Sequence, residues 1–306
     1  MAWNFRSDAE RDLTEPERRG MISPSFHIWE ETMPLFTVDA DKCRHDGICA
    51  AVCPLDLIEP ADKDHLPRPV KDAEKECLNC GHCMAACPFG ALELERMPLS
   101  ECRPIAKEAA LTPEQVAQFL QSRRSCRAYK DQPVPRSTLE RLVRIASYAP
   151  SGHNTQPTSW LVVEDTREVR RLAEITVDFL RIMIKDLPEL AHLVHAQQIV
   201  DGWEAGQDPV FRGAPHVIVA HGQKDARTAP MGCVIAQTYL ELAAFGLGLG
   251  ACWAGYFNAA TLNHPPMQEA LGLPEGHQNF GALMIGWPQY AYYRIPLRNE
   301  PRIVWR

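Results

Sequence analysis

The chain has 306 residues, a length that suits two domains better than one. Hydrophobic residues make up 45% of it, enough to bury a core, and the net charge of -7 disfavours nucleic acid or an anionic membrane as the main partner. No apolar run is long enough to span a bilayer, and the polar residues 1–20 lack the apolar core of a secretory signal, so we expect a cytoplasmic protein.

Residues 1–34 are polar and carry scattered aromatic side chains, among them Trp3, Phe5, Phe26 and Trp29. Two interpretations stay open for this segment. It is either an arm that packs on a partner surface or a partly ordered tail.

Residues 35–96 hold seven of the eleven cysteines and form the first predicted domain. Disulfides are rare in a reducing compartment, so metal ligation is the leading explanation for so many cysteines. Short apolar runs at residues 35–38, 57–58 and 91–94 predict brief strands. A domain of this size has a small core and usually needs additional stabilisation, such as a bound metal.

The seven cysteines fall into two runs of equal length that both close with Cys-Pro. The second run, from Cys77 to Pro88, follows C-x2-C-x2-C-x3-C-P, the spacing of bacterial iron–sulfur proteins. Three thiolates on one tight loop can each reach a different iron of a cubane cluster. The first run, from Cys43 to Pro54, carries Asp46 where the second cysteine would stand.

These runs resemble the two-cluster bacterial ferredoxins over residues 35–96. The resemblance implies a ferredoxin-like domain in which each cluster takes one ligand from the other run. The implied ligands of a 4Fe–4S cluster are Cys77, Cys80, Cys83 and Cys53. The implied ligands of the other cluster, a 3Fe–4S or a labile 4Fe–4S cluster, are Cys43, Cys49 and Cys87 with Asp46.

Asp46 leaves two hypotheses open. A carboxylate can bind iron but is a harder ligand than thiolate, so the cluster is either labile with Asp46 bound, or always 3Fe–4S beside a solvated Asp46. Structural zinc is disfavoured, because zinc sites usually pair two C-x2-C knuckles across a longer loop. The remaining cysteines share no ligand spacing and are predicted to be small buried hydrophobic residues: Cys102, Cys126, Cys233 and Cys252.

A linker is predicted at residues 97–111 and the second domain at residues 112–306. Thr112 and Gln115 form a predicted capping box that opens a helix. The further predicted elements are a helix at 137–148, strands at 159–163 and 216–220, a helix at 229–245 with Gly246 as its C-cap, and a strand at 280–286. Strands interleaved with helices indicate an α/β or α+β domain.

The segment after the first helix of this domain carries three guanidinium groups and one hydroxyl within five residues. They belong to Arg123, Arg124, Arg127 and Ser125. Such a cluster can clamp a phosphate through charge-assisted, forked hydrogen bonds. Basic residues at a helix C-terminus also complement the helix dipole, and this motif alone does not exclude that alternative.

Two further segments can contact a flavin ring. Residues 149–157 form a predicted helix-to-strand loop, in which the amides of Asn154 and Gln156 suit the pyrimidine edge. The glycines of residues 246–255 let a backbone approach a flat ring, and their spacing is not a dinucleotide fingerprint. Taken alone, residues 149–157 are equally explained as an ordinary loop, and residues 246–255 as a glycine-rich helix end.

In this order and spacing, the three segments resemble the nitroreductase family of FMN enzymes over residues 112–306. The resemblance implies an α+β fold with a central mixed sheet flanked by helices, and an obligate homodimer with FMN at the subunit interface. Many members carry an acidic residue where Ala254 stands, so this chain departs from the family there. The implied contacts of the FMN phosphate and ribityl groups are Arg123, Arg124, Ser125 and Arg127, together with Arg294 or Arg298 from the C-terminal segment. The residues implied to line the ring are Pro150, Ser151, Asn154 and Gln156. The backbone of Ala254 and Gly255 is implied to face the ring.

The fusion itself predicts a function. Clusters pass electrons singly, whereas hydride donors and nitro or quinone acceptors exchange pairs, and FMN does both. We therefore expect reduction of a nitroaromatic, a quinone or a similar electrophile, with NAD(P)H or an external donor protein as the source of electrons. The alternative is an electron carrier or redox sensor that relays electrons to a partner protein.

Overall fold

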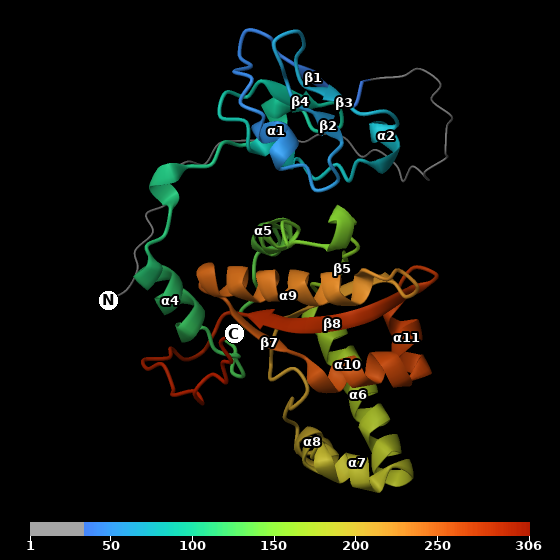
Figure 1. The fold of residues 1–306 in the computed structure, drawn as a ribbon. Coiled ribbons are helices and arrows are strands. Elements are labelled where there is room, and N and C mark those ends of the chain that lie inside the picture. Colours follow the sequence, from blue (N-terminus) through green and yellow to red (C-terminus); the bar gives the residue numbers. More distant parts are fainter. Residues whose placement is uncertain (1–33) are drawn as a thin grey trace.

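The computed structural model describes residues 34–306, so the predicted arm at residues 1–34 falls almost wholly outside the described part of the chain. Figure 1 shows a small cysteine-rich domain above a larger domain with one sheet, joined along one side by an extended segment. This segment contains helix α4 (Pro113–Ser122). Among residues 34–306, no helix combines the length and apolar character that a membrane crossing needs.

The small domain is held by two short antiparallel strand pairs. Strand β1 (Phe36–Val38) pairs with β4 (Leu92–Leu94), and β2 (Ile58–Glu59) pairs with β3 (Arg68–Pro69). The predicted apolar runs at 35–38 and 91–94 contain β1 and β4, and the run at 57–58 overlaps β2 at Ile58. The one-turn helices are α1 (Ile48–Ala51), α2 (Ala73–Glu76) and α3 (His82–Ala85). The buried core comprises only Phe36, Cys49, Ile58, Met84, Leu92 and Leu94, which is little apolar surface for a domain of this size.

The large domain is built on a four-stranded sheet. Its spatial order is β5 (Ser159–Val163), β6 (His216–Gln223), β8 (His277–Gly286) and β7 (Gly250–Trp253), so β5 and β7 form the two edges. All three pairings are antiparallel. Among residues 34–306, the parallel part of the expected mixed sheet is a single bridge, between Ser125 and Ala251 on the outer edge of β7.

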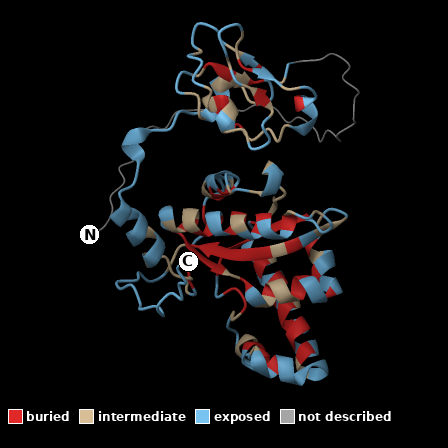
Figure 2. Ribbon diagram, in the orientation of Figure 1, coloured by how far each residue is buried: buried red, intermediate tan, exposed pale blue. Residues whose placement is uncertain are grey.

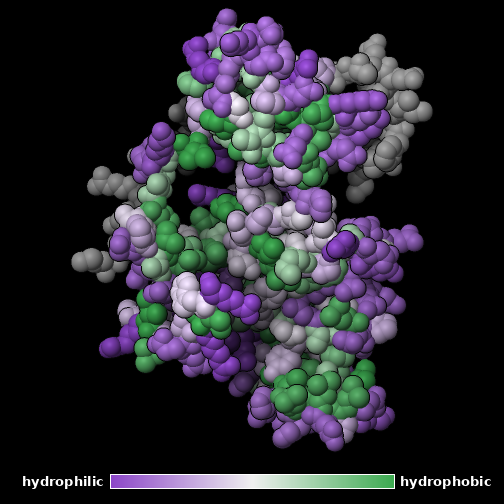
Figure 3. All heavy atoms as spheres, in the orientation of Figure 1, coloured by the Kyte–Doolittle hydropathy of each residue, from purple (hydrophilic) through white to green (hydrophobic). Residues whose placement is uncertain are grey.

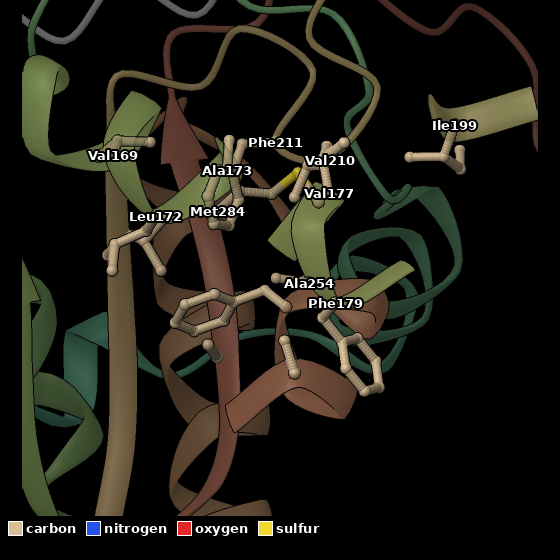
Figure 4. Close-up of a cluster of buried hydrophobic side chains, with 14 of the residues drawn as sticks. Val169, Leu172, Ala173, Val177, Phe179, Ile199, Val210, Phe211, Ala254 and Met284 are labelled. Carbon is tan, nitrogen blue, oxygen red and sulfur yellow. The ribbon is translucent and has the colours of Figure 1, made fainter. Parts of the chain in front are cut away.

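Helices cover both faces of the sheet. Helices α5 (Arg136–Ala146) and α9 (Ala229–Gly246) pack on one face, and α6 (Thr166–Asp186), α8 (Ala196–Glu204), α10 (Gly255–Asn263) and α11 (Pro265–Leu271) pack on the other. Neighbouring residues of one strand point to opposite faces, so Ile218 and Leu283 join the α5–α9 core, whereas Val219 and Met284 join the α6–α10 core. Figure 2 shows the buried residues concentrated in the sheet, and Figure 4 shows part of the α6–α10 core.

The predicted elements of the large domain are present, with shifts of a few residues at their ends. The capping box is confirmed: the Gln115 backbone N–H donates to Thr112 Oγ1 (3.2 Å), and the Thr112 N–H donates to Gln115 Oε1 (2.9 Å). The prediction of Gly246 as C-cap is wrong, because α9 includes Gly246 and it is Gly248 that adopts the left-handed conformation (φ +75°). Sequence reasoning missed α6, α7 (Pro188–Leu193), α8, β7, α10 and α11.

The side chain of His216, at the start of β6, is hydrogen-bonded to the segment before α5. Its buried imidazole Nε2 accepts a hydrogen bond from the Val134 N–H (2.8 Å), and Nδ1 lies 2.8 Å from the Glu164 carbonyl oxygen, to which it must donate. This arrangement requires the neutral ring. Burial lowers the pKa of His216.

We expect His216→Leu to reduce the free energy of unfolding by about 1–3 kcal/mol near neutral pH, because it leaves the buried Val134 N–H and the part-buried Glu164 carbonyl without their partner. Since the folded-state pKa is lowered, the stability that His216 contributes is present above its ordinary pKa of about 6.5 and is lost as pH falls toward the lowered value. The difference between wild type and variant should therefore shrink from about pH 7.5 to about pH 5.5 in denaturant titrations. A difference that stays constant contradicts this role, and the exposed His192→Leu serves as the matched control.

Candidate iron–sulfur and flavin sites

The two cysteine runs fold alike. Each contains a left-handed residue two positions after its first cysteine, His45 (φ +55°) or Asn79 (φ +48°). Each also has a left-handed glycine two positions further on, Gly47 (φ +72°) or Gly81 (φ +73°). This repeated backbone shape curls both loops in the same way. Equal spacing in the sequence thus becomes equal geometry in the fold.

The first group of thiols combines both runs. Cys83 lies near Cys77 and Cys80 of its own run and near Cys53 of the other run. Burial, together with the proximity of these three thiols, raises the pKa of Cys83 to about 11. The four residues are those of the first implied ligand set.

The second group surrounds a small cavity lined by Cys43, Asp46, Cys49 and Cys87, with apolar walls from Val38 and Leu92. Burial, followed by the nearby Cys43 and Asp46, raises the pKa of Cys49. Among residues 34–306, no three ligand-type side chains are placed to hold a single metal ion. A polynuclear cluster requires wider spacing, because each thiolate binds a different iron.

Backbone N–H groups point at the cysteine sulfurs. Leu57 N–H lies 3.3 Å from Cys53 Sγ, Asn79 N–H lies 3.4 Å from Cys77 Sγ, and Ala91 N–H lies 3.3 Å from Cys87 Sγ. Such donors stabilise thiolate ligands and tune the potential of a cluster. The donor set therefore fits iron–sulfur clusters in both groups.

Asp46 lines the second cavity and also shapes the loop. Its Oδ1 accepts a hydrogen bond from the Ile48 N–H (3.1 Å) at the start of α1. The neighbouring His45 is occupied elsewhere, with Nδ1 2.9 Å from the carbonyl oxygen of Asp62. Arg44 and His45 also line this cavity, but Asp46 is the carboxylate of the run there, and its hydrogen bond involves only Oδ1.

The predicted phosphate clamp lies along the outer edge of β7. Ser125 bridges Ala251, and the Cys126 N–H donates to the Ala251 carbonyl (2.9 Å). A Cβ at Gly250 would meet the Cys126 side chain at 2.6 Å, so only glycine allows this close approach. The clamp is therefore fixed directly to the sheet.

The arginines of the clamp differ in their surroundings. Arg123 Nη1 forms an ion pair with Glu241 Oε1 of α9 (2.7 Å), so its charge is already balanced within the chain. Arg127 is exposed, and within residues 34–306 neither it nor Arg124 forms an ion pair. These two guanidinium groups are the ones available to an anion.

Arg127 lies on the rim of a large cavity of about 780 Å³. Cys252, Trp253, Gly255 and Tyr256 form one wall, and residues of α6 and α7 form the other. Gly255 is the first residue of α10, whose N-terminus has no side-chain cap, and a Cβ there would meet nothing within 4 Å. The site can thus present free backbone N–H groups, open space and a cation to a flat anionic ligand such as a flavin phosphate.

The predicted ring-lining loop lies elsewhere in the chain. Pro150, Ser151 and Gln156 line a smaller cavity together with Gly232 and Ala236 of α9. Its shape is fixed by left-handed residues at His153, Asn154 and Gln156 (φ +53°, +52° and +44°) and by the Gln156 N–H donating to Ser151 Oγ (2.9 Å). This loop precedes β5, at the opposite edge of the sheet from the clamp.

Asn154 connects this loop to the small domain. Its Nδ2 donates to the carbonyl oxygens of Leu78 (3.1 Å) and Asn79 (3.0 Å), which lie between Cys77 and Cys80. The ring-lining loop at residues 149–157, called the flavin loop below, therefore directly contacts the loop of Cys77, Cys80 and Cys83, called the cluster loop.

The predicted flavin residues accordingly form two groups within one chain. Ser125, Arg127, Ala254 and Gly255 lie near β7, whereas Pro150, Ser151, Asn154 and Gln156 lie before β5. Arg294 and Arg298 lie in the exposed C-terminal segment, which Tyr292 connects to the clamp by donating to the Ser125 carbonyl (3.4 Å). The α6–α7 wall was not predicted, although the helical spacing of Val169, Leu172, Ala173 and Leu180 is a signal that could have found it.

Of the four cysteines outside the two runs, Cys126, Cys233 and Cys252 are buried, as predicted, and Cys102 is half-buried. Burial raises the pKa of each of the three buried thiols. They behave as small hydrophobic residues.

Comparison with known proteins gives two family matches: the nitroreductase family over residues 120–287, and a 4Fe-4S dicluster domain over residues 41–91. An NADH dehydrogenase of Thermus thermophilus is 30% identical over 200 residues, which cover 60% of this chain and 92% of that protein. A chloronitrobenzene nitroreductase of Comamonas testosteroni is 26% identical over 199 residues, covering 55% and 85%. The structure of a nitroreductase with bound FMN from Bacteroides fragilis shares the fold, with a TM-score of 0.53, 21% identity, and coverage of 63% and 99%.

We expect Asp46→Cys to give a stable 4Fe–4S cluster in the second group, because the loop already has the shape that places a thiolate at the fourth iron in the other run. The measurement is iron and sulfide content with EPR after brief air oxidation. The variant should lose the 3Fe–4S signal of the wild type.

His45→Ala is the matched control, since His45 is the neighbouring exposed side chain and is directed at the Asp62 carbonyl. It should leave the EPR spectrum of the wild type unchanged. A 3Fe–4S signal that persists in Asp46→Cys would show that position 46 does not reach the fourth iron.

Proposed function

Because the chain belongs to the nitroreductase family and its residues 41–91 match a 4Fe-4S dicluster domain, we propose that it is an FMN-dependent oxidoreductase that passes electrons between iron–sulfur clusters and FMN. Its proposed substrate is a nitroaromatic, a quinone or a similar electrophilic small molecule. The observation that carries this proposal is the contact of Asn154 with the carbonyls of Leu78 and Asn79, which joins the cluster loop to the flavin loop.

The proposed domains are a two-cluster ferredoxin domain at residues 35–96, a linker at 97–111 and an FMN-binding domain at 112–306. The grouping of the thiols supports the ligand sets that the ferredoxin resemblance implies. One cluster would be held by Cys77, Cys80, Cys83 and Cys53, and the other by Cys43, Cys49 and Cys87 with Asp46.

The division of the flavin residues into two groups supports a homodimer with FMN at its interface. In one chain the groups lie at opposite edges of the sheet, the clamp beside β7 and the ring-lining loop before β5. A second copy would bring the loop of one chain to the clamp of the other. Exposed apolar side chains over α7, such as Leu187, Leu190 and Leu193, and Leu297 and Trp305 in the C-terminal segment are surfaces that such a partner would cover (Figure 3).

Each group has a distinct task in the proposed site. FMN, when bound, supplies the exchange between single electrons and electron pairs. Arg127, with Arg124, neutralises the phosphate, and Ser125 offers a hydroxyl beside them. The uncapped N-terminus of α10 at Gly255 offers N–H groups to the ring. The wall formed by α6 and α7 offers apolar side chains and leaves room for a small aromatic substrate beside the ring.

A second candidate function is electron transfer or redox sensing through a partner protein. The observation that favours it is the exposure of Arg44, His45 and Asp46 around the second group of thiols, which leaves that cluster open to an external protein. A redox-dependent partner without turnover of small molecules would support this function over the enzyme.

The first test is composition and turnover of protein purified without oxygen. We expect FMN, iron and acid-labile sulfide in the isolated protein, and reduction of nitroaromatics or quinones with NAD(P)H or a reduced ferredoxin as donor. The measurements are the absorption spectrum with metal and flavin quantification, followed by steady-state assays. Colourless protein without flavin or sulfide would overturn the proposed function.

The second test concerns the clamp. We expect Arg127→Ala to weaken FMN binding by about 10–100-fold, because a charge-assisted hydrogen bond contributes roughly 1.5–3 kcal/mol. The affinity is measured by flavin fluorescence titration of the apoprotein. Arg144→Ala, an exposed arginine on α5, is the control and should bind FMN as the wild type does. Equal affinities of both variants would argue against the clamp.

A further inference from the structure

The contact between the two domains involves the loop of only one of the two proposed clusters. Asn154 donates to the Leu78 and Asn79 carbonyls, and both residues belong to the loop of Cys77, Cys80 and Cys83. The cavity of Cys43, Asp46, Cys49 and Cys87 is lined by other parts of the small domain. The cluster proposed for Cys77, Cys80, Cys83 and Cys53 is therefore the one that lies against the flavin loop.

The backbone conformation on both sides of this contact favours the hydrogen bonds of Asn154 with the cluster loop. Asn79 and Asn154 are both left-handed, which turns the Asn79 carbonyl and the Asn154 amide toward each other. The Asn154 Oδ1 accepts a hydrogen bond from Gln156 Nε2 (3.4 Å), which orients the amide so that its N–H groups face the cluster loop. The contact thus depends on backbone conformation as well as on one side chain.

The clamp of the same chain lies far from this contact. The sheet order β5–β6–β8–β7 places three strand intervals, about 14 Å, between the edge that follows the loop and the edge that carries the clamp. The two groups also use opposite faces: Ser151 and Gln156 line a cavity with α9, whereas Arg127 lines a cavity with α6 and α10. Because these two cavities lie on opposite faces of the sheet, a ring beside the clamp and Gly255 does not lie against the loop of the same chain.

We infer that the cluster loop of each chain serves the FMN whose phosphate is clamped by a second copy of the chain, so that electrons pass between subunits. This inference rests on the proposed function. Electrons move singly: each passage oxidises one cluster by one electron and reduces the flavin by one, and an external one-electron donor protein reduces the cluster again. Two passages and two protons from water complete the reduction of the flavin.

Two mixed dimers test the direction of this path. Arg127→Ala makes a clamp-deficient chain, and Cys80→Ser makes a cluster-deficient chain. The first dimer pairs a clamp-deficient chain with a cluster-deficient chain. The second pairs a chain carrying both substitutions with a wild-type chain. Differently tagged chains are co-expressed and purified anaerobically, and each dimer contains one intact clamp and one intact cluster loop.

The readouts are flavin and iron content, and the rate at which flavin absorbance is lost after mixing with reduced methyl viologen. The Cys80→Ser homodimer supplies the baseline rate of direct flavin reduction. In the first dimer, the intact clamp faces the cluster loop of the chain whose clusters are intact. We therefore expect the flavin absorbance to decrease at least about tenfold faster than the baseline rate. In the second dimer the intact clamp faces a cluster-deficient loop, so we expect the baseline rate.

The opposite pattern, a fast second dimer and a slow first dimer, would show transfer within one chain and overturn the inference while leaving the proposed function in place. Equal rates in both dimers would overturn it as well. Absence of flavin or clusters from the wild-type homodimer would instead overturn the proposed function. A second ligand variant, Cys77→Ser, is carried in parallel, so that a folding defect of one cluster-deficient chain does not decide the result.

Discussion

The two domains meet through the side-chain amide of Asn154 and the backbone carbonyls of Leu78 and Asn79. Such neutral hydrogen bonds contribute only about 1 kcal/mol each, so they orient the domains more than they hold them together. The covalent linker supplies the proximity, as a short tether gives a high effective concentration. Because the acceptors are backbone atoms between Cys77 and Cys80, the contact depends on the shape of the cluster loop.

That shape depends in turn on what binds the cysteines. The core of the small domain consists of a handful of side chains around Phe36, Met84 and Leu92, and its strands have two or three residues each. Metal binding to such a domain is part of its folding free energy. In the proposed protein, therefore, the clusters carry electrons and also hold the surface on which Asn154 docks.

Sequence patterns were sufficient wherever the chemistry is local. The spacing of Cys77, Cys80 and Cys83 and the capping box at Thr112 depend on neighbours a few residues away, and strand 159–163 is apolar after its first residue. The C-terminus of α9 was misjudged because Gly246 and Gly248 are both plausible helix ends, and it is Gly248 that adopts the left-handed conformation. The ion pair of Arg123 with Glu241 joins residues 118 positions apart, so no local pattern contains it. The separation of the flavin residues into two groups follows from strand order, which a single sequence does not determine.

The same strand order separates the path of electrons from the path of substrate in the proposed dimer. The cluster loop meets the loop before β5 on the α9 side, whereas the large cavity opens beside α6, α7 and α10. That cavity is lined by Arg127, Arg212 and Asp186, so cationic groups exceed anionic ones. Ala254 adds no carboxylate beside the ring position, and Gly255 leaves the space next to it open. In the proposed dimer, an electron-poor or anionic aromatic substrate would therefore meet more positive than negative charge at this cavity, on the side that the clusters do not occupy.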